Sequence, residues 1–311
     1  MPHDGVAIDI LTGFLGSGKT TLLRHILTHG LEGRRVAVVM NEIGDVGIDG
    51  RVIEGLNVER MIELGSGCVC CTINREFGLA LQEIVETVDP ELIVVETTGV
   101  ADPPNIVSET RQVGLTVDAT ICVVDAANLS RHLAVSDVAR EQIAASDFLV
   151  LNKTDLVDAA EADRAEALLR EINARALVTR TAYGAVAADV LFGTAARSHA
   201  ERPREAGDGR HLERDQITSF VHESARPFDR GRFERFLEAL PAEIYRAKGI
   251  VRFTESEWSC LFNFTCGRTE YEWREPAGTG FVGRSVFIGS GAAAMRDALT
   301  RDLEACLALI Q

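Results

Sequence analysis

A glycine-rich octapeptide near the start of the chain constrains its fold more than any other feature. Residues 13–20 read Gly-Phe-Leu-Gly-Ser-Gly-Lys-Thr, which fits the pattern G-x-x-x-x-G-K-[ST]. They follow the apolar run Val6–Leu11 and open a helical pattern over Thr20–His29. Between a strand and a helix, this pattern is a P-loop, in which backbone N–H groups and the positive end of the helix dipole surround phosphate oxygens. The sequence therefore predicts an α/β nucleotide-binding domain.

The P-loop gives a role to each of its polar residues. Lys19 is expected to neutralise the β- and γ-phosphates, and the Thr20 hydroxyl to ligate Mg²⁺. The other phosphate-binding candidates are Gly13, Gly16, Ser17, Gly18 and Thr21. Only three of the 32 basic residues are lysines, and one of them is Lys19. Because a P-loop needs a compact ammonium rather than a wide guanidinium fork, this usage supports the prediction.

Up to about residue 195, short apolar runs alternate with helical patterns. Further runs are Val36–Met40, Leu92–Val95, Ile121–Val124 and Phe148–Leu151, and helical spacing occurs over 76–88 and 159–172. Continuous apolar strands separated by helices are typical of a parallel sheet covered on both faces. We predict a mainly parallel α/β domain over residues 1–195.

A second nucleotide motif follows the run Phe148–Leu151. Residues 152–155 read Asn-Lys-Thr-Asp, which resembles the guanine-reading N-K-x-D motif of P-loop GTPases. The resemblance implies that Asp155 accepts hydrogen bonds from guanine N1–H and the exocyclic amine, a pair that adenine cannot complete. It also implies that Asn152 supports the loop and O6 recognition, and that the stem of Lys153 lies against the base.

A third motif, E-x-x-G, follows the run Leu92–Val95. In P-loop proteins the acid in this place, here Glu96, holds Mg²⁺ or its water, and the N–H of the glycine, here Gly99, senses the γ-phosphate. We therefore predict Lys19, Glu96 and Gly99 as catalytic residues and Thr20 and Glu96 as magnesium ligands. Asp125, which ends the run Ile121–Val124, is favoured as a structural residue.

Three of the seven cysteines form a C-x-C-C cluster at Cys68, Cys70 and Cys71. Thiolates are soft ligands that suit Zn²⁺, Co²⁺ or Cu⁺. Sulfur from one segment makes an open site rather than a closed four-cysteine one, unless one of the other four cysteines joins it. Glu42 and Asp45, after the second apolar run, could complete a metal shell, contact Mg²⁺ or form a solvated loop. The alternative for the cluster is reactive or incidental cysteines. The remaining cysteines are expected to be small buried apolar residues; they are Cys122, Cys260, Cys266 and Cys306.

The sequence changes character after residue 195. Residues 196–215 form a polar linker, and its two histidines are expected to be solvated. Strands are predicted from apolar runs at 217–221, 250–253, 260–265, 269–273 and 285–288. Asp229 is expected to cap a helix that runs through Leu240, and a closing helix is expected over 292–309. Successive strands flanked by helices indicate a smaller α+β domain around an antiparallel sheet over 216–311.

Charge and hydropathy exclude several classes of function. The net charge of −15 argues against non-specific nucleic-acid binding, which depends on phosphate neutralisation. No apolar run approaches the roughly 20 residues that span a bilayer, and the apolar run near the N-terminus lacks a basic flank. We therefore expect no membrane segment, no signal peptide and a cytoplasmic location.

Five motifs, taken in their order along the chain, resemble those of the CobW-like family of GTP-dependent metallochaperones. They are GFLGSGKTTLL, NEIGDVGID, GCVCC, ETTGVADP and NKTD. Three later segments are similar to the C-terminal domain of that family: Ile217–Val221, Arg226–Asp229 and Arg246–Gly249. The resemblance implies a SIMIBI-type GTPase fold, with Cys68, Cys70 and Cys71 as the metal motif and Glu42 as the switch glutamate associated with it. Ile43 and Asp45 depart from the usual Phe and Glu of the family.

The resemblance implies a GTPase that uses Mg²⁺, carries Zn²⁺ or Co²⁺ at the C-x-C-C cluster, and delivers it to a client metalloenzyme or another protein of a metal pathway. A nucleotide-dependent homodimer is a further expectation. The alternative function is a GTP-dependent switch that acts on a protein partner, with zinc at the cysteines only holding the fold.

Overall fold

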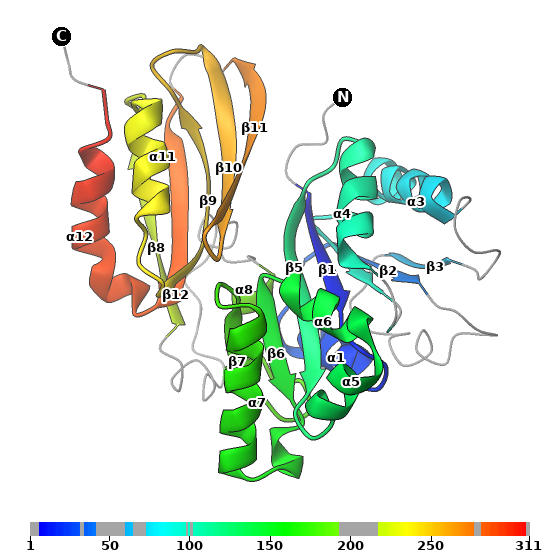
Figure 1. Cartoon of the computed structure of the whole chain (residues 1–311). Coiled ribbons are helices and arrows are strands. Elements are labelled where there is room, and N and C mark those ends of the chain that lie inside the picture. The colour runs from blue at the N-terminus through cyan, green and yellow to red at the C-terminus, as the bar shows by residue number, and fades with distance from the viewer. Residues whose placement is uncertain are drawn as a thin grey trace. The chain divides into compact units, whose positions relative to one another are not determined.

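The computed structural model describes residues 6–31, 34–41, 60–64, 73–97, 99, 102–192, 217–276 and 281–308. Contacts between Cα atoms divide the chain into two compact units, Met1–Phe192 and Gly193–Gln311. Each unit has its own sheet (Figure 1). The polar linker predicted for 196–215 lies outside the described residues.

The first unit is built on a seven-stranded sheet with the order β3-β2-β4-β1-β5-β6-β7. All of its neighbouring strands pair in parallel. The strands are β1 (Ala7–Thr12), β2 (Val36–Asn41), β3 (Arg60–Leu64), β4 (Leu92–Glu96), β5 (Val117–Asp125), β6 (Phe148–Asn152) and β7 (Leu177–Arg180). The predicted α/β class and parallel sheet are confirmed.

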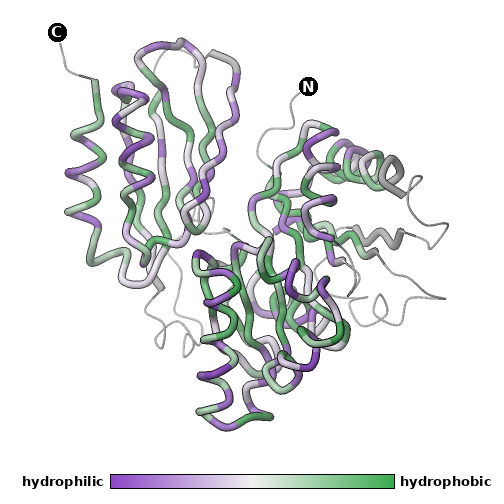
Figure 2. Tube along the Cα trace, in the orientation of Figure 1, coloured by the Kyte–Doolittle hydropathy of each residue, from purple (hydrophilic) through white to green (hydrophobic). Residues whose placement is uncertain are grey.

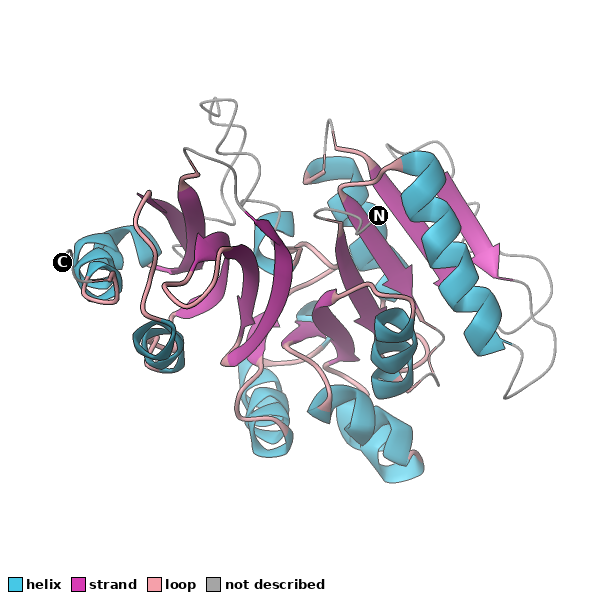
Figure 3. Cartoon of the chain, turned by 90° about the horizontal axis from the view of Figure 1, so that it is seen from above, coloured by secondary structure: helices cyan, strands magenta, loops and turns pink. Residues whose placement is uncertain are grey.

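Helices alternate with most of these strands along the chain. Figure 3 distinguishes the helices from the strands by colour. They are α1 (Lys19–His29), α3 (Ile73–Val88), α4 (Pro103–Gln112), α5 (Leu129–Val135), α6 (Asp137–Ala144), α7 (Ala159–Ile172), α8 (Ala188–Leu191) and the 3₁₀ turn η1 (Thr154–Leu156). α3 and α4 pack on one end of the sheet, and α6 and α7 on the other end of the same face. Residues of the opposite face, such as Val38 and Val94, are also fully buried, so both faces are covered. Figure 2 shows the resulting concentration of hydrophobic residues in the strands.

Several elements of this unit differ from the sequence-based prediction. The edge strands β3 and β7 were not predicted, because their sequences Arg-Met-Ile-Glu-Leu and Leu-Val-Thr-Arg contain no continuous apolar run. Helix α4 begins with two prolines, which are turn signals but are also tolerated at the first helical positions. Helix α3 begins at Ile73 instead of Glu76.

Parallel pairing places the carboxyl ends of the strands at one edge of the sheet. The P-loop follows β1 there, residues 97–99 follow β4, and residues 152–155 end β6. The segment that carries the C-x-C-C cluster joins the carboxyl end of β3 to the start of α3, and Glu42 follows β2. Ligands of open α/β sheets bind at this edge, and the topology brings the P-loop, Glu96 and the N-K-x-D turn to it.

The second unit contains a five-stranded antiparallel sheet with the order β11-β10-β9-β12-β8. Its strands are β8 (Ile217–Ser224), β9 (Ile244–Arg252), β10 (Trp258–Thr265), β11 (Arg268–Pro276) and β12 (Gly283–Ser290), and its helices are α11 (Arg230–Glu238) and α12 (Ala292–Glu304). Both helices pack with one face of the sheet around an aromatic core that includes Phe233, Phe262 and Phe287. The predicted α+β class is confirmed.

Two boundaries of the second unit correct the prediction. Strand β9 begins at Ile244 rather than Ile250, because pairing with β10 and β12 on either side defines a strand whose first half mixes polar and apolar residues. Helix α12 ends at Glu304 rather than Leu309, because the next residues pair with the segment before α11, where Asp229 N–H donates to the Cys306 carbonyl. Asp229 also caps α11 as predicted, by accepting from the backbone N–H of Arg232 at 2.8 Å. Among the helices of the described residues, none combines the length and apolar character needed to cross a bilayer.

Candidate nucleotide site

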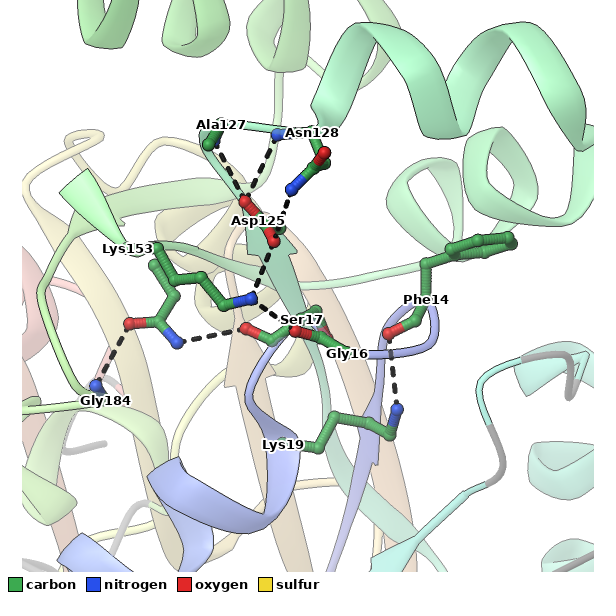
Figure 4. A network of polar contacts seen from close by, with 10 residues as sticks. Phe14, Gly16, Ser17, Lys19, Asp125, Ala127, Asn128, Lys153 and Gly184 are labelled. Atoms are coloured by element: carbon green, nitrogen blue, oxygen red, sulfur yellow. Dashed lines mark hydrogen bonds and ion pairs between the residues drawn. The ribbon is translucent and has the colours of Figure 1, made fainter. Parts of the chain in front are cut away.

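The P-loop holds a buried ammonium group at its centre. Lys19 begins α1, and its Nζ donates to the carbonyl of Gly13 at 2.8 Å. It also reaches the carbonyl of Phe14 at 3.5 Å (Figure 4). The residue is only 9% exposed. Thr21 lies half-buried in the first turn of the same helix. The loop therefore directs its one lysine to the place where phosphate oxygens would enter.

Asn152 joins the P-loop to the N-K-x-D motif. Its Nδ2 donates to the carbonyl of Ser17 at 3.0 Å, and its Oδ1 accepts from the N–H of Gly184 at 3.0 Å (Figure 4). Gly18 has a φ of +104°, and a Cβ there would lie 2.4 Å from Asn152 Nδ2. Glycine at position 18 is thus required both by the backbone conformation and by the close approach of this amide.

Lys153 makes a second link between the two motifs. Its Nζ donates to the Gly16 carbonyl at 2.6 Å and to Asp125 Oδ2 at 2.7 Å (Figure 4). Asp125 also accepts from the backbone N–H groups of Ala127 and Asn128. Burial raises the pKa of Asp125, but hydrogen bonds from Lys153 and Asn128 outweigh burial and leave the pKa below its ordinary value. Asp125 therefore stays ionised, and its contacts agree with the structural role predicted for it.

Asp155 stands apart from these buried contacts. It lies in the 3₁₀ turn η1 directly after the Asn152–Lys153 pair, and it is exposed. The neighbouring Thr154 fixes the turn, because both its N–H and its hydroxyl donate to the carbonyl of Thr181, at 3.2 and 3.0 Å. The carboxylate is thus held on an ordered turn while it remains accessible to a ligand.

The two predicted magnesium ligands are neighbours in the structure. Thr20 Oγ1 donates to Glu96 Oε1 at 3.0 Å, although the residues are 76 positions apart in the chain. Glu96 is 6% exposed at the end of β4. A hydroxyl beside a carboxylate supplies the hard oxygen donors that Mg²⁺ prefers, so these residues fit the ion.

Gly99 lies against the P-loop. A Cβ at this position would be 2.6 Å from the backbone nitrogen of Leu15, so only glycine fits without moving one of the two segments. The carbonyl of Gly99 accepts from Nε2 of Gln142, a fully buried residue of α6, at 3.3 Å. The sequence predicted Gly99 from its motif but gave no indication of Gln142 and Gly184. These two residues belong to no motif, and their hydrogen bonds to Gly99 and Asn152 are visible only in the folded structure.

This close approach leads to a first prediction. Gly99→Ala should push the loop after β4 away from Leu15 and slow GTP hydrolysis by about 10- to 100-fold, since a displacement near 1 Å in an active site has effects of that size. GDP affinity should change little. Single-turnover hydrolysis and GDP titration measure the two quantities. Gly231→Ala is a control, because the added methyl would meet no atom closer than 3.5 Å; equal hydrolysis rates in the two variants would contradict the prediction.

The predicted transition-metal ligands Cys68, Cys70, Cys71 and Glu42 lie outside the described residues. Within the residues that are described, no group of three or more His, Cys, Asp or Glu side chains could hold a metal ion. The four other cysteines form no disulfide with a described residue. Cys122, Cys260 and Cys306 are buried as predicted, while Cys266 is half-buried. Burial raises the pKa of Cys122 to about 12, so burial disfavours the thiolate form of this cysteine.

Together, the parallel sheet, the P-loop and the attached N-K-x-D turn define a nucleotide-binding protein of the P-loop GTPase class. Residues 7–180 match the family described as CobW/HypB/UreG, nucleotide-binding domain, and residues 217–307 match the cobalamin synthesis protein cobW C-terminal domain. The chain belongs to the CobW/HypB/UreG family, and the family predicted from the motifs is confirmed.

Relatives extend over most of the chain. It is 31% identical to the zinc chaperone CobW of Sinorhizobium sp., with 94% of this chain and 95% of the relative covered. It is 32% identical to the zinc chaperone YjiA of Escherichia coli, over 88% and 90% of the two chains. A zinc-bound crystal structure of the Escherichia coli YjiA GTPase covers 97% of this chain and 99% of its own, with 24% identity and a TM-score of 0.48.

Proposed function

We propose that this protein binds and hydrolyses GTP and uses the nucleotide to control the binding of a transition metal. The observation that carries the nucleotide part is the pair of links from Asn152 and Lys153 to the carbonyls of Ser17 and Gly16. They make the phosphate loop and the guanine-reading turn one continuous site. A nucleotide bound there would be read at both ends, which favours guanine nucleotides over other phosphate compounds.

Each residue of the site has its own role in binding and hydrolysis of GTP. Lys19 binds the β- and γ-phosphates and stabilises the charge that develops on them. Thr20 and Glu96 would hold Mg²⁺, which neutralises phosphate charge when it is bound. Gly99 contributes a backbone N–H at the γ-phosphate and so makes the loop after β4 sensitive to whether the γ-phosphate is present. Asp155 selects guanine through its two acceptor oxygens.

For the metal, we propose Zn²⁺ or Co²⁺ bound by Cys68, Cys70 and Cys71 with Glu42. Relatives at 31–32% identity are named zinc chaperones, and a relative of Schizosaccharomyces pombe, 37% identical over 58% of this chain, is named zinc-regulated GTPase metalloprotein activator 1. The cysteine segment connects β3 to α3 and therefore starts from the same edge of the sheet as the nucleotide motifs. This arrangement supports communication between the metal and the γ-phosphate.

The expected acceptor of the metal is a client metalloenzyme or another protein of a metal pathway. An open site of three thiolates exchanges its metal more easily than a closed site of four, which suits delivery. A nucleotide-dependent homodimer and a cytoplasmic location stay predictions. The alternative, a GTP-dependent switch with a purely structural zinc, makes a different prediction for the same measurement.

The test is the affinity for Zn²⁺ and for Co²⁺ in the presence of GDP and of a non-hydrolysable GTP analogue with Mg²⁺. If the nucleotide controls the metal site, the metal should bind about 5- to 150-fold more tightly in the GTP-analogue state, and it should tighten binding of the analogue by the same factor. Proton release should accompany binding, because thiolates must be deprotonated to ligate the metal.

A double variant, Cys70→Ala with Cys71→Ala, should lose high-affinity metal binding in both nucleotide states. Cys266→Ala provides the matched control, because this half-buried thiol belongs to the second unit and is not in the proposed metal motif. Equal metal affinity of the unaltered protein in the two nucleotide states would reject the metallochaperone mechanism and favour the switch with structural zinc.

A further inference from the structure

Tyr183 is an unusual residue in the described part of the first unit. Its side chain is 73% exposed, which is more than any other large apolar side chain among the described residues. Its backbone has a φ of +57°, in the left-handed region that bulky residues rarely adopt. Within the described part of the chain, the ring makes no hydrogen bond and no contact with another ring. No hydrogen bond or ring contact among the described residues therefore explains an aromatic residue at this position.

The turn that contains Tyr183 is attached directly to the guanine-reading motif. On one side, the Thr181 carbonyl accepts from the N–H and the hydroxyl of Thr154. On the other side, the N–H of Gly184 donates to Asn152 Oδ1 at 3.0 Å. Tyr183 lies between these two attachments, so its backbone is anchored to Thr154 and Asn152, two residues of the N-K-x-D motif. A hydrogen bond from Ala185 N–H to the Ala182 carbonyl closes the turn at 3.2 Å.

The conformation of the turn is also well determined by its packing. A Cβ at Gly184 would lie 2.6 Å from Leu22 Cα, so the turn rests tightly on α1. Four non-glycine residues of the described chain have positive φ values, and two of them, Lys153 and Tyr183, lie in these two joined loops. Strained backbone of this kind is concentrated at binding and active sites.

We infer that Tyr183 is a base-stacking residue that covers the purine ring of the bound nucleotide. This inference rests on the proposed binding of GTP. Asp155 reads the edge of the base, and the stem of Lys153 is expected to lie against the ring. An aromatic ring carried by the turn that is joined to this motif would supply contact with the face of the base, which edge recognition lacks. Stacking accounts for both the exposed ring of Tyr183 and the positive φ of the turn that presents it.

Three substitutions test the inference in the full chain, with affinity for GDP and Mg²⁺–GTP measured by calorimetry. Tyr183→Ala removes the ring and should weaken both nucleotides about 5- to 150-fold, the range for loss of one base–aromatic stack. Tyr183→Phe keeps the ring and should bind within about twofold of the unaltered protein. Tyr183→Gly also removes the ring but relieves the positive φ, so it should lose affinity as Tyr183→Ala does while the nucleotide-free protein keeps or raises its unfolding temperature.

Two further readouts separate stacking from a structural role. Tripolyphosphate, used as a competitor, should bind all Tyr183 variants equally, since it has no base. The ratio of GTP affinity to xanthosine triphosphate affinity should also be unchanged, because an aromatic ring contacts the face of any purine. Val135→Ala, a change at a 68% exposed residue of α5, should leave every value unaltered.

The outcomes distinguish this inference from the proposed function. If the unaltered protein binds GDP and GTP but Tyr183→Gly binds them equally well, the stacking role is wrong and GTP binding stands. Loss of tripolyphosphate binding in Tyr183→Gly, or equal losses in Tyr183→Phe and Tyr183→Ala, would also reject stacking. If the unaltered protein does not bind guanine nucleotides, the proposed function itself fails.

Discussion

Lys19→Ala should reduce GTP binding or turnover by at least about 100-fold, in line with the 10²–10³-fold effect of removing one preorganised donor from an active site. The Lys19 ammonium is held inside the P-loop by the Gly13 carbonyl. A nucleotide would therefore meet a positive charge that is already in place. Lys19→Arg should lose most of the activity as well, because the guanidinium fork is wider than the space that the ammonium occupies.

The measurement is GTP affinity and steady-state hydrolysis, together with thermal unfolding of the nucleotide-free protein. Arg24→Ala is the control, because it removes the same charge from an exposed position of the same helix α1. It should retain both activities. Hydrolysis in Lys19→Ala at the rate of the unaltered protein would exclude the P-loop as the phosphate site.

Asp155→Asn should change which base the protein prefers. The variant replaces one acceptor oxygen with a donor, so guanine, with two donors facing this residue, should bind about 100-fold more weakly. Xanthine has a carbonyl where guanine has its exocyclic amine, and xanthosine triphosphate should therefore regain affinity in the variant. Because Asp155 is exposed, the free energy of unfolding should change by no more than about 0.5–1 kcal/mol.

Competition between GTP, ATP and xanthosine triphosphate measures this preference directly. Glu171→Gln removes one negative charge from an exposed position of α7 and should leave the preference for GTP as it is. If the unaltered protein bound ATP as tightly as GTP, the assignment of the N-K-x-D turn to guanine would have to be abandoned.

The sequence predicts the centre of the first unit well and its edges poorly, for a physical reason. Central strands such as β5 and β6 are buried on both faces and are apolar at most positions, so their apolar parts are visible as the continuous runs Ile121–Val124 and Phe148–Leu151. The edge strands β3 and β7 have fewer such constraints, and they become strands through pairing with β2 and β6. Such pairing is a property of the assembled sheet and leaves little trace in a single sequence.

The same distinction holds for the nucleotide site. Lys19, Thr20 and Glu96 were predicted, because phosphate and magnesium chemistry restricts the residue type and the spacing at these positions. Gln142 and Tyr183 were not predicted, because each is brought to the site by the packing of elements far away in the sequence. A buried glutamine or an exposed tyrosine becomes informative only once its neighbours are known.

The links from Asn152 and Lys153 to the P-loop also bear on the kinetics of nucleotide exchange. Because the protein's own hydrogen bonds join the phosphate loop to the base-reading turn, the relative position of the two segments does not depend on contacts with the nucleotide, and binding carries a smaller entropic cost. The association rate constant of a preorganised site is limited mainly by diffusion and by the orientation of the ligand. The lifetime of the bound state then depends mainly on how fast contacts to the phosphates and the base are lost, so differences in affinity among variants of this site should arise in the dissociation rate.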